Sequence, residues 1–123
     1  MEAVLKTADG TTVCDRCVVA RTPLSRMKGL LGRTGLSAGE GLLLQPAQAI
    51  HTAFMKFSID AIFLDRNLRV LAVESHLKPW RAAGRRKARF VLELGAGETA
   101  RLSLEPGVAL RCEELERGRD GAE

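Results

Sequence analysis

Aromatic side chains are scarce in this sequence, which has no tyrosine, one tryptophan and four phenylalanines among its 123 residues. Proteins that bind single-stranded nucleic acids without reading their sequence stack successive bases on aromatic side chains. So low an aromatic content makes a base-stacking surface an unfavoured prediction. The net charge of +4 does not alter this, because a modest positive charge is also common in proteins that bind no polyanion.

Cysteine is scarce as well, with Cys14, Cys17 and Cys112 as the only three. An odd number in a chain of this length does not predict a disulfide framework, which agrees with a reducing compartment. A zinc site needs about four ligands, and residues three apart on a regular strand point to opposite faces. We therefore expect small core and edge residues, with no metal and no cofactor. A bend at Asp15-Arg16 would bring two thiols together and favour a metal or redox role.

Long hydrophobic runs are absent. No segment approaches the roughly 18 consecutive apolar residues that a membrane-spanning helix requires. The first residues, MEAVLKTADGTTV, contain Glu2 and Lys6 and lack the apolar core of a signal peptide. These absences predict a cytoplasmic protein that does not contact a membrane.

What the sequence does contain is the composition of an ordinary globular domain, with 46% hydrophobic and 28% charged residues. Its length suits a single hydrophobic core. The end of the chain, EELERGRDGAE, is polar and has almost no apolar anchor. We therefore predict one domain over residues 1–112 and a frayed tail over residues 113–123.

Hydrophobic patterning predicts a mainly β fold. Residues 11–20, TTVCDRCVVA, are rich in Val and Thr and follow the turn-like ADG, which predicts a strand. From residue 41 onward short apolar runs alternate with turn signals, and PGVALRC returns the chain to a final strand. The segment DRNL predicts a hairpin turn, with Asn67 as the residue suited to positive φ. The pattern favours six to eight strands in a β sandwich or barrel.

Helices are predicted to be few and short. Thr22 and Pro23 form an N-cap and first-turn pair, after which Leu24, Met27 and Leu31 recur on one helix face. This predicts a short amphipathic helix. A second segment, AGETARLSL, is long enough for one or two helical turns. The loop TGLSAGEG between them is too rich in glycine for either element.

Two later segments differ in how many faces they bury. In RFVLEL the apolar residues Phe90, Leu92 and Leu94 alternate with Arg89, Val91 and Glu93, which predicts a strand with one buried face. LRVLAVE is apolar on both faces and predicts a strand that is covered on both sides.

The segment IHTAFMKFSIDAIFLD, residues 50–65, is the best place to look for a site. It carries His51, Lys56 and Asp60 within an apolar run, and an unpaired buried polar group costs about 1–3 kcal/mol. If residues 49–55 form a strand, His51 and Met55 share one face and Thr52 lies on the other. A tight turn would then bring Asp60 near His51 or Lys56.

Such a cluster has two interpretations. A carboxylate that holds an imidazole fixes its tautomer and raises its pKa, which suits acid–base work or anion binding. In the structural alternative, Asp60 accepts backbone hydrogen bonds at the turn and His51 is a satisfied rim residue. The residues alone favour the structural alternative, because no nucleophile, phosphate-binding loop or second carboxylate accompanies the cluster.

Four segments together, RMKGLLGR, IHTAFMKFSIDAIFLD, LKPWR and VLELGAG, resemble the bacterial and archaeal family of domain of unknown function 192 over roughly residues 23–110. The resemblance implies one small β domain, jelly-roll-like or barrel-like, with no established activity. Two departures, Ala53 in place of an aromatic and Ser58 in place of a proline, imply a roomier pocket and a less rigid turn. The family's characteristic positions correspond to His51, Thr52, Met55, Lys56, Asp60, Pro79 and Trp80.

The loop KPWRAAGRRKAR, residues 78–89, places six basic residues around Trp80. Basic residues interleaved with aromatics can follow a phosphate backbone and stack a base. Without a second aromatic in the loop, we expect a solvated loop in which Trp80 covers the end of the sheet, and nucleic acid is an unfavoured partner. Trp80 can also line a pocket beside His51.

The favoured function is therefore a binding module for a small polar or anionic molecule. Its pocket is predicted to have Met55 and Trp80 as apolar walls and His51, Thr52, Lys56 and Asp60 as polar groups. Two alternatives stay open: a hydrolase-like or other acid–base enzyme that uses the same residues, and a nucleic-acid-binding module that uses residues 78–89. Catalysis would require His51 and Asp60 to lie within hydrogen-bond reach in an open cleft.

Overall fold

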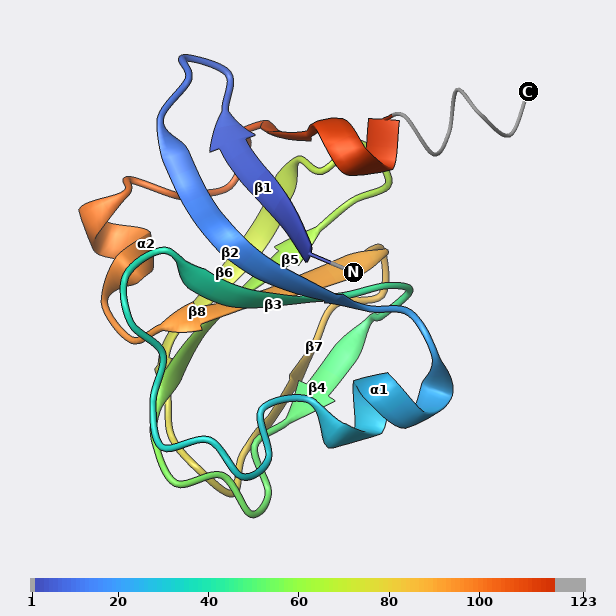
Figure 1. Cartoon of the computed structure of the whole chain (residues 1–123), viewed down its shortest axis with the longest axis vertical. Coiled ribbons are helices and arrows are strands. Elements are labelled where there is room, and N and C mark those ends of the chain that lie inside the picture. The colour runs from blue at the N-terminus through green and yellow to red at the C-terminus, as the bar shows by residue number, and fades with distance from the viewer. Residues whose placement is uncertain (1, 117–123) are drawn as a thin grey trace.

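The computed structural model describes residues 2–116. Most of the ordered elements are strands, and the two helices α1 and α2 are short (Figure 1). In chain order the elements are β1 (Glu2–Thr7), β2 (Thr12–Ala20), α1 (Pro23–Lys28), β3 (Glu40–Leu44), β4 (Ala49–His51), β5 (Ile59–Leu64), β6 (Val70–Leu77), β7 (Ala82–Gly84), β8 (Phe90–Gly95), α2 (Glu98–Arg101) and β9 (Leu110–Cys112).

Seven strands form one curled sheet in the order β6-β5-β8-β3-β2-β1-β9, and β4 pairs with β7 in a separate two-stranded ribbon. The pair β2–β3 is parallel and the other pairs are antiparallel. The two edges of the large sheet meet: Val70 N–H donates to Val108 O at 2.8 Å, and Leu110 N–H donates to Leu68 O at 2.9 Å. The prediction of a mainly β sandwich or barrel is thus confirmed, although the described residues contain nine strands where six to eight were expected, and a third short helical segment in addition to α1 and α2.

The central strands β5, β8 and β3 are buried on both faces. Along β5, Ile62 and Leu64 belong to one apolar cluster, whereas Ala61 and Phe63 belong to another on the opposite face. The first cluster fills the interior of the curled sheet. The second lies between the sheet and a second layer, which consists of the α1 segment with Leu30 and the β4–β7 ribbon. Figure 1 shows α1 and this ribbon on the same side of the sheet, below β3. This second layer later provides the walls of a pocket.

Helix α1 begins where the sequence predicts it. Thr22 Oγ1 accepts the Ser25 N–H, and Ser25 Oγ accepts the Thr22 N–H, both at 3.0 Å, which forms a reciprocal cap. The prediction that α1 buries an apolar face is wrong, however, because the helix buries none of its residues. Leu24 and Met27 are 78% and 73% exposed. The apolar residue that anchors this segment is instead Leu30, which follows the helix.

The predicted hairpin turn between β5 and β6 is present, but its unusual backbone conformation lies one residue later than expected. Asp65 Oδ1 accepts the N–H groups of Asn67 and Arg69 at 2.8 and 3.0 Å. The side chain of Asp65 thus closes the turn. Positive φ occurs at Leu68, with 62°, and not at Asn67.

The prediction of one buried face for the strand around Phe90 is wrong. All six residues of β8 are buried, and this includes Glu93, which is 5% exposed. The reason is position, because β8 lies between β3 and β5 and has apolar layers on both sides. A carboxyl group is therefore held inside the protein at a place where the alternating pattern would put it at the surface.

The positions of Cys14 and Cys17 also differ from those predicted for a regular strand. The β1–β2 register shifts between Ala3, which is opposite Cys17, and Leu5, which is opposite Cys14. This irregularity supplies the bend that would bring the thiols together, and both lie in the same core cluster as Cys112. Hydrogen bonding with Cys14 and burial raise the pKa of the Cys17 thiol. The three are free buried thiols, and residues 2–116 contain no cluster of three or more His, Cys, Asp or Glu arranged to hold a metal ion.

The first part of the predicted tail is ordered. Residues 113–116 form a helical turn, and Leu115 is buried in the interior cluster. The remainder of that prediction, residues 117–123, lies outside the described residues. No helix in the described part of the chain is long and apolar enough to cross a membrane.

Close packing at β3 gives a stability test. A Cβ atom at Gly41 would lie 2.8 Å from Cys14 Sγ, 2.9 Å from Leu94 Cδ2 and 3.1 Å from Glu93 O. We expect Gly41→Ala to lower the free energy of unfolding by about 1–3 kcal/mol through overpacking, as measured by urea denaturation. The control is Gly35→Ala, where nothing lies within 4 Å of the new Cβ. Equal effects of the two substitutions would contradict this account of the β3 packing.

Candidate functional site

The strand on which the predicted site was built ends early. β4 stops at His51, and residues 52–57 form a compact irregular loop instead of continuing the strand to Met55. The alternation of faces therefore ceases at Thr52. The polar side chains of this segment consequently go to different places.

Thr52 is fully buried and joins two loops. Its hydroxyl donates to Lys78 O at 2.6 Å and accepts the Arg81 N–H at 2.8 Å. Its backbone adds two further bonds, from Thr52 N–H to Arg81 O at 2.8 Å and from Trp80 N–H to Thr52 O at 3.0 Å. Thr52 thus holds residues 52–57 against residues 78–81, and its polar atoms are used within the protein.

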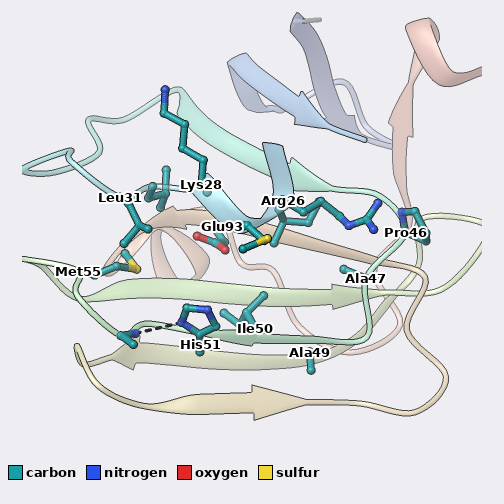
Figure 2. Close-up of a pocket in the computed structure, with 15 residues that line it drawn as sticks. Arg26, Lys28, Leu31, Pro46, Ala47, Ala49, Ile50, His51, Met55 and Glu93 are labelled. Atoms are coloured by element: carbon teal, nitrogen blue, oxygen red, sulfur yellow. Dashed lines mark hydrogen bonds between the residues drawn. The ribbon is translucent and has the colours of Figure 1, made fainter. Parts of the chain in front are cut away.

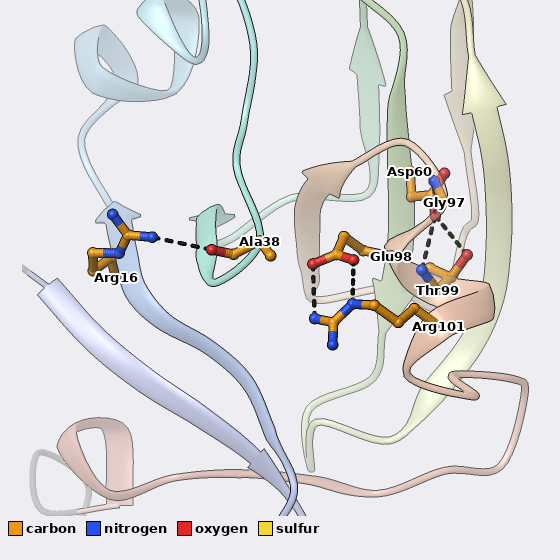
Figure 3. Close-up of polar contacts among 7 residues, drawn as sticks. All are labelled: Arg16, Ala38, Asp60, Gly97, Glu98, Thr99 and Arg101. Atoms are coloured by element: carbon orange, nitrogen blue, oxygen red, sulfur yellow. Dashed lines mark hydrogen bonds and ion pairs between the residues drawn. The ribbon is translucent and has the colours of Figure 1, made fainter.

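Asp60 is also fully buried, and its carboxylate is surrounded by donors (Figure 3). Oδ1 accepts the His76 N–H at 2.9 Å. Oδ2 accepts the N–H groups of Gly97 and Thr99 at 3.1 and 2.9 Å and the Thr99 hydroxyl at 2.6 Å. Burial alone would raise the pKa of Asp60, but these hydrogen bonds, of which the one from the Thr99 hydroxyl counts most, outweigh it and lower the pKa.

This arrangement matches the structural alternative, in which Asp60 accepts backbone hydrogen bonds. The donors, however, do not come from the adjacent turn but from segments further along the chain. His76 belongs to β6, whereas Gly97 and Thr99 begin α2. The carboxylate therefore joins three segments and does not contact His51 or Lys56 by any hydrogen bond or ion pair in residues 2–116.

Lys56 and Trp80 lie at the surface. The Lys56 side chain is exposed, and Trp80 is 61% exposed. The indole packs against Phe54 in a tilted arrangement, with 4.6 Å between ring centroids and 60° between ring planes. The sequence predicted that Trp80 covers the end of the sheet or lines a pocket beside His51. Its exposed position matches neither prediction.

His51 and Met55 are the two predicted residues that the structure brings together. They line a pocket of about 180 Å³ between the α1 segment and β4 (Figure 2). Its surface is polar and apolar in about equal parts, and Leu30, Leu44, Ile50 and Met55 are among its buried apolar lining residues. The full lining is Arg26, Met27, Lys28, Gly29, Leu30, Leu31, Leu44, Pro46, Ala47, Ala49, Ile50, His51, Ala53, Met55 and Glu93.

Glu93 is the buried polar group of this pocket. Figure 2 shows its carboxylate in the middle of the lining residues, at the sheet that forms the pocket floor. Burial raises the pKa of Glu93 to about 7. Among the described residues no side chain or backbone group forms a hydrogen bond or ion pair with its carboxyl group. The pocket therefore contains an acid that is half ionised near neutral pH.

The two cations of the lining do not neutralise Glu93. Arg26 Nη1 donates to Arg21 O at 2.8 Å and to Gln45 O at 3.4 Å, and Figure 2 shows its guanidinium directed toward Pro46. The Lys28 side chain is exposed and points away from the pocket. This explains why burial alone determines the pKa of the carboxyl group.

A backbone hydrogen bond determines which ring nitrogen of His51 is available to a ligand. Its Nδ1 accepts the Ala53 N–H at 3.3 Å, so the neutral ring carries its hydrogen on Nε2. The imidazole is exposed at the side of the pocket formed by β4. His51 thus offers a hydrogen-bond donor, whereas Glu93 offers an acceptor when it is ionised.

Glu93 was missed because sequence reasoning assigned its strand only one buried face. The available signal was a single acid in the apolar run FVLEL, followed by the glycine-containing turn GAG. A strand with apolar residues at both Val91 and Leu92 is compatible with burial on both faces. In that setting an isolated glutamate is a candidate for a functional carboxyl group.

The fold and pocket define a class of protein: a small curled β domain with a compact pocket over one face of its central strands. Comparison with known proteins agrees. A family model for DUF192, described as an uncharacterized ACR, matches residues 4–112. The chain therefore belongs to the DUF192 family, as its resemblance to domain of unknown function 192 implied.

Individual relatives agree with this family assignment. A 46-residue segment is 50% identical to UPF0127 protein PH1112 of Pyrococcus horikoshii, and the match spans 37% of this chain and 39% of that protein. A crystal structure of a protein of unknown function from Novosphingobium aromaticivorans DSM 12444 aligns with a TM-score of 0.77 at 24% identity, over 90% of this chain and 84% of that one.

A second crystal structure, of a proposed transcription regulator from Sinorhizobium meliloti 1021, aligns with a TM-score of 0.78 at 25% identity. The alignment covers 91% of this chain and 92% of that one. These likenesses show a shared fold. The family and the first of these two proteins have no described function.

The hydrogen bonds of Asp60 give a further test. Asp60→Ala should lower the free energy of unfolding by about 1–3 kcal/mol at pH 7, because it leaves buried donors unpaired. Because the folded-state pKa is lowered, the contribution of Asp60 is present above its unfolded pKa and is lost as the pH falls through the folded value. Urea denaturation at several pH values measures both effects. The control is Asp15→Ala at an exposed site, and a change within about 0.5 kcal/mol for Asp60→Ala would contradict the structural role.

Glu93 should have the opposite effect on stability. Its pKa is raised from 4.5 to about 7 on folding, so the folded state binds the proton more tightly than the unfolded state. Stability is therefore expected to fall as the pH rises from about 4.5 to about 7 and then to level off, with a total change of about 3 kcal/mol. Glu93→Gln should remove this part of the pH dependence. Parallel stability curves for wild type and Glu93→Gln over this range would show that the carboxyl group is not buried as described.

Proposed function

We propose that this protein is a binding module for a small polar molecule, and that the site is the pocket lined by His51, Met55 and Glu93. The observation that carries the proposal is the Glu93 carboxyl group, which is 5% exposed and has no partner among the described residues. Every fully buried side-chain oxygen or nitrogen of the described residues has a hydrogen-bond partner, so the unpaired Glu93 oxygens are reached from the pocket. A ligand in the pocket can therefore donate a hydrogen bond to this acceptor.

The shape of the pocket limits the size of the ligand. Its volume of about 180 Å³ is below the roughly 300–1,000 Å³ of sites for drug-sized molecules. Leu30, Leu44 and Ile50 offer apolar contacts to a small hydrocarbon portion. Met55 is flexible and can adjust its packing to the bound group.

The polar groups indicate which chemistry the ligand should carry. Glu93 accepts a hydrogen bond from an amine or hydroxyl group, and His51 Nε2 can donate to an oxygen or nitrogen acceptor. The acid at the floor favours a polar or cationic molecule over an anion. Lys56 and Asp60, on which the sequence-based expectation of an anionic ligand depended, take no part in this site, because neither lines the pocket.

A second candidate is an acid–base enzyme, and one observation favours it. A general acid or base works best when its pKa lies near the working pH, and the pKa of Glu93 is about 7. His51 lines the same pocket and provides a second titratable group. In this alternative Glu93 and His51, and not His51 and Asp60, would exchange protons with a bound substrate.

Thermal-shift screening tests the proposal. A panel of small primary amines, amino alcohols, polyols and carboxylates would be added to the protein at pH 6 and pH 8. A ligand at one hundred times its Kd stabilises the folded state by about 2.7 kcal/mol, which gives a measurable rise in Tm. We expect compounds with amine or hydroxyl groups to raise Tm more than carboxylates do.

Matched variants assign the site. Glu93→Gln and His51→Ala should lose the ligand-induced rise in Tm, whereas Lys56→Ala, which removes an exposed charge outside the pocket, should keep it. An equal rise in wild type and Glu93→Gln would refute the proposed site. Turnover of a bound compound that is lost in Glu93→Gln would instead favour the enzymatic candidate.

A further inference from the structure

A pair of aromatic side chains stands at the surface and does not line the pocket. Phe54 and Trp80 are 71% and 61% exposed and pack against each other at a tilt of 60°, with ring centroids 4.6 Å apart. They come from different loops, which Thr52 joins through five hydrogen bonds to residues 78–81. The chain has five aromatic residues, so two of the five are held in solvent and excluded from the core.

The backbone at both positions is unusual. Phe54 and Trp80 have φ values of 65° and 63°, a region that bulky side chains rarely adopt and that carries a cost in free energy. Glycine would adopt the same conformation without this cost. The fold thus keeps two strained aromatic rings together at the surface, an arrangement that contributes little to the core and leaves both rings accessible to a ligand.

Cations flank this pair along the sequence. Lys56, Lys78 and Arg81 are exposed neighbours of the two rings in sequence. The strand β7 then leads from Trp80 and Arg81 toward a second basic region at its other end. That region is a hollow of about 430 Å³ lined by Gln48, Asp65, Arg66, Asn67, Arg86, Lys87 and Arg89.

The basic side chains of the hollow are free to meet a ligand. Among residues 2–116, none of Arg66, Arg86, Lys87 and Arg89 forms an ion pair, whereas Arg85 is neutralised by Glu74 at 2.9 Å. All four are exposed. At about 3.3 Å per residue, the segment from Trp80 to Arg86 spans up to about 20 Å, so a flexible polyanion can contact the aromatic pair and the hollow at the same time.

We propose that this strip, defined as Phe54, Trp80 and the basic residues 78–89 with Arg66, binds single-stranded nucleic acid. Unpaired bases would stack on Phe54 and Trp80, and phosphates would pass along the basic side chains. The sequence alone disfavoured this partner because Trp80 had no second aromatic in its loop. The structure supplies one, Phe54, from a loop 26 residues earlier. None of the residues of the strip lines the Glu93 pocket, and the proposal does not depend on the function of that pocket.

Fluorescence anisotropy with labelled 20-nucleotide single-stranded RNA and DNA tests the proposal between 50 and 300 mM salt. Phe54→Gly and Trp80→Gly remove a ring and also relieve the positive φ, so the variants should fold at least as well as wild type, which thermal melts can check. Each is expected to weaken binding about tenfold through loss of stacking. The triple variant Arg86→Gln, Lys87→Gln, Arg89→Gln should weaken binding and lower the slope of log affinity against log salt by about 2.

A charge-matched control distinguishes a specific strip from general attraction. Lys6→Gln, Lys28→Gln, Arg111→Gln removes three exposed cations outside the strip and should change affinity less than twofold. Absence of binding at 50 mM salt would overturn the proposal. So would an equal loss of affinity in the two triple variants, unchanged affinity in both glycine variants, or tighter binding of a duplex than of single strands, because each outcome removes the role of base stacking on Phe54 and Trp80.

Discussion

The carboxylate of Asp60 is the interaction on which the remaining arrangement depends. It is fully buried and accepts four hydrogen bonds from residues of β6 and the start of α2. Because these donors belong to distant parts of the chain, one side chain of β5 fixes where the end of β6 and the turn after β8 must lie. β5 and β8 are then held in register, and the pocket floor with them.

The two buried carboxyl groups of the adjacent strands β5 and β8 have pKa values that are shifted in opposite directions. In the β5–β8 register Asp60 is opposite Leu94, and Ala61 is opposite Glu93. Neighbouring residue pairs point to opposite faces of a sheet, so Asp60 and Glu93 extend in opposite directions. One side provides four donors and lowers the pKa of Asp60, whereas the other buries Glu93 without a donor and raises its pKa. Surroundings, and not residue type, separate the structural acid from the candidate functional one.

The features that local patterns determine were predictable from sequence. The strands, the capping of α1 by Thr22 and the turn after Leu64 follow from alternation, capping and turn residues. Three features depend on contacts between distant segments and were not predictable: the end of β4 at His51, the double burial of β8, and the irregular register that turns Cys14 and Cys17 to one side. The candidate site was predicted least well. His51 and Met55 were expected in a pocket, whereas Glu93, which lies in β8 and 42 residues after His51, was not.

Closure of the sheet has a consequence for synthesis on the ribosome. The edge formed by residues 68–70 is covered by residues 107–110, which lead into β9. While the chain emerges, β1 and β6 therefore keep unpaired edges until nearly all of the domain has left the exit tunnel. Open strand edges pair readily with other chains, and contacts between distant segments form slowly. The residues around Ala109 cover this edge by pairing with Arg69, so a chain that lacks them would leave the edge open.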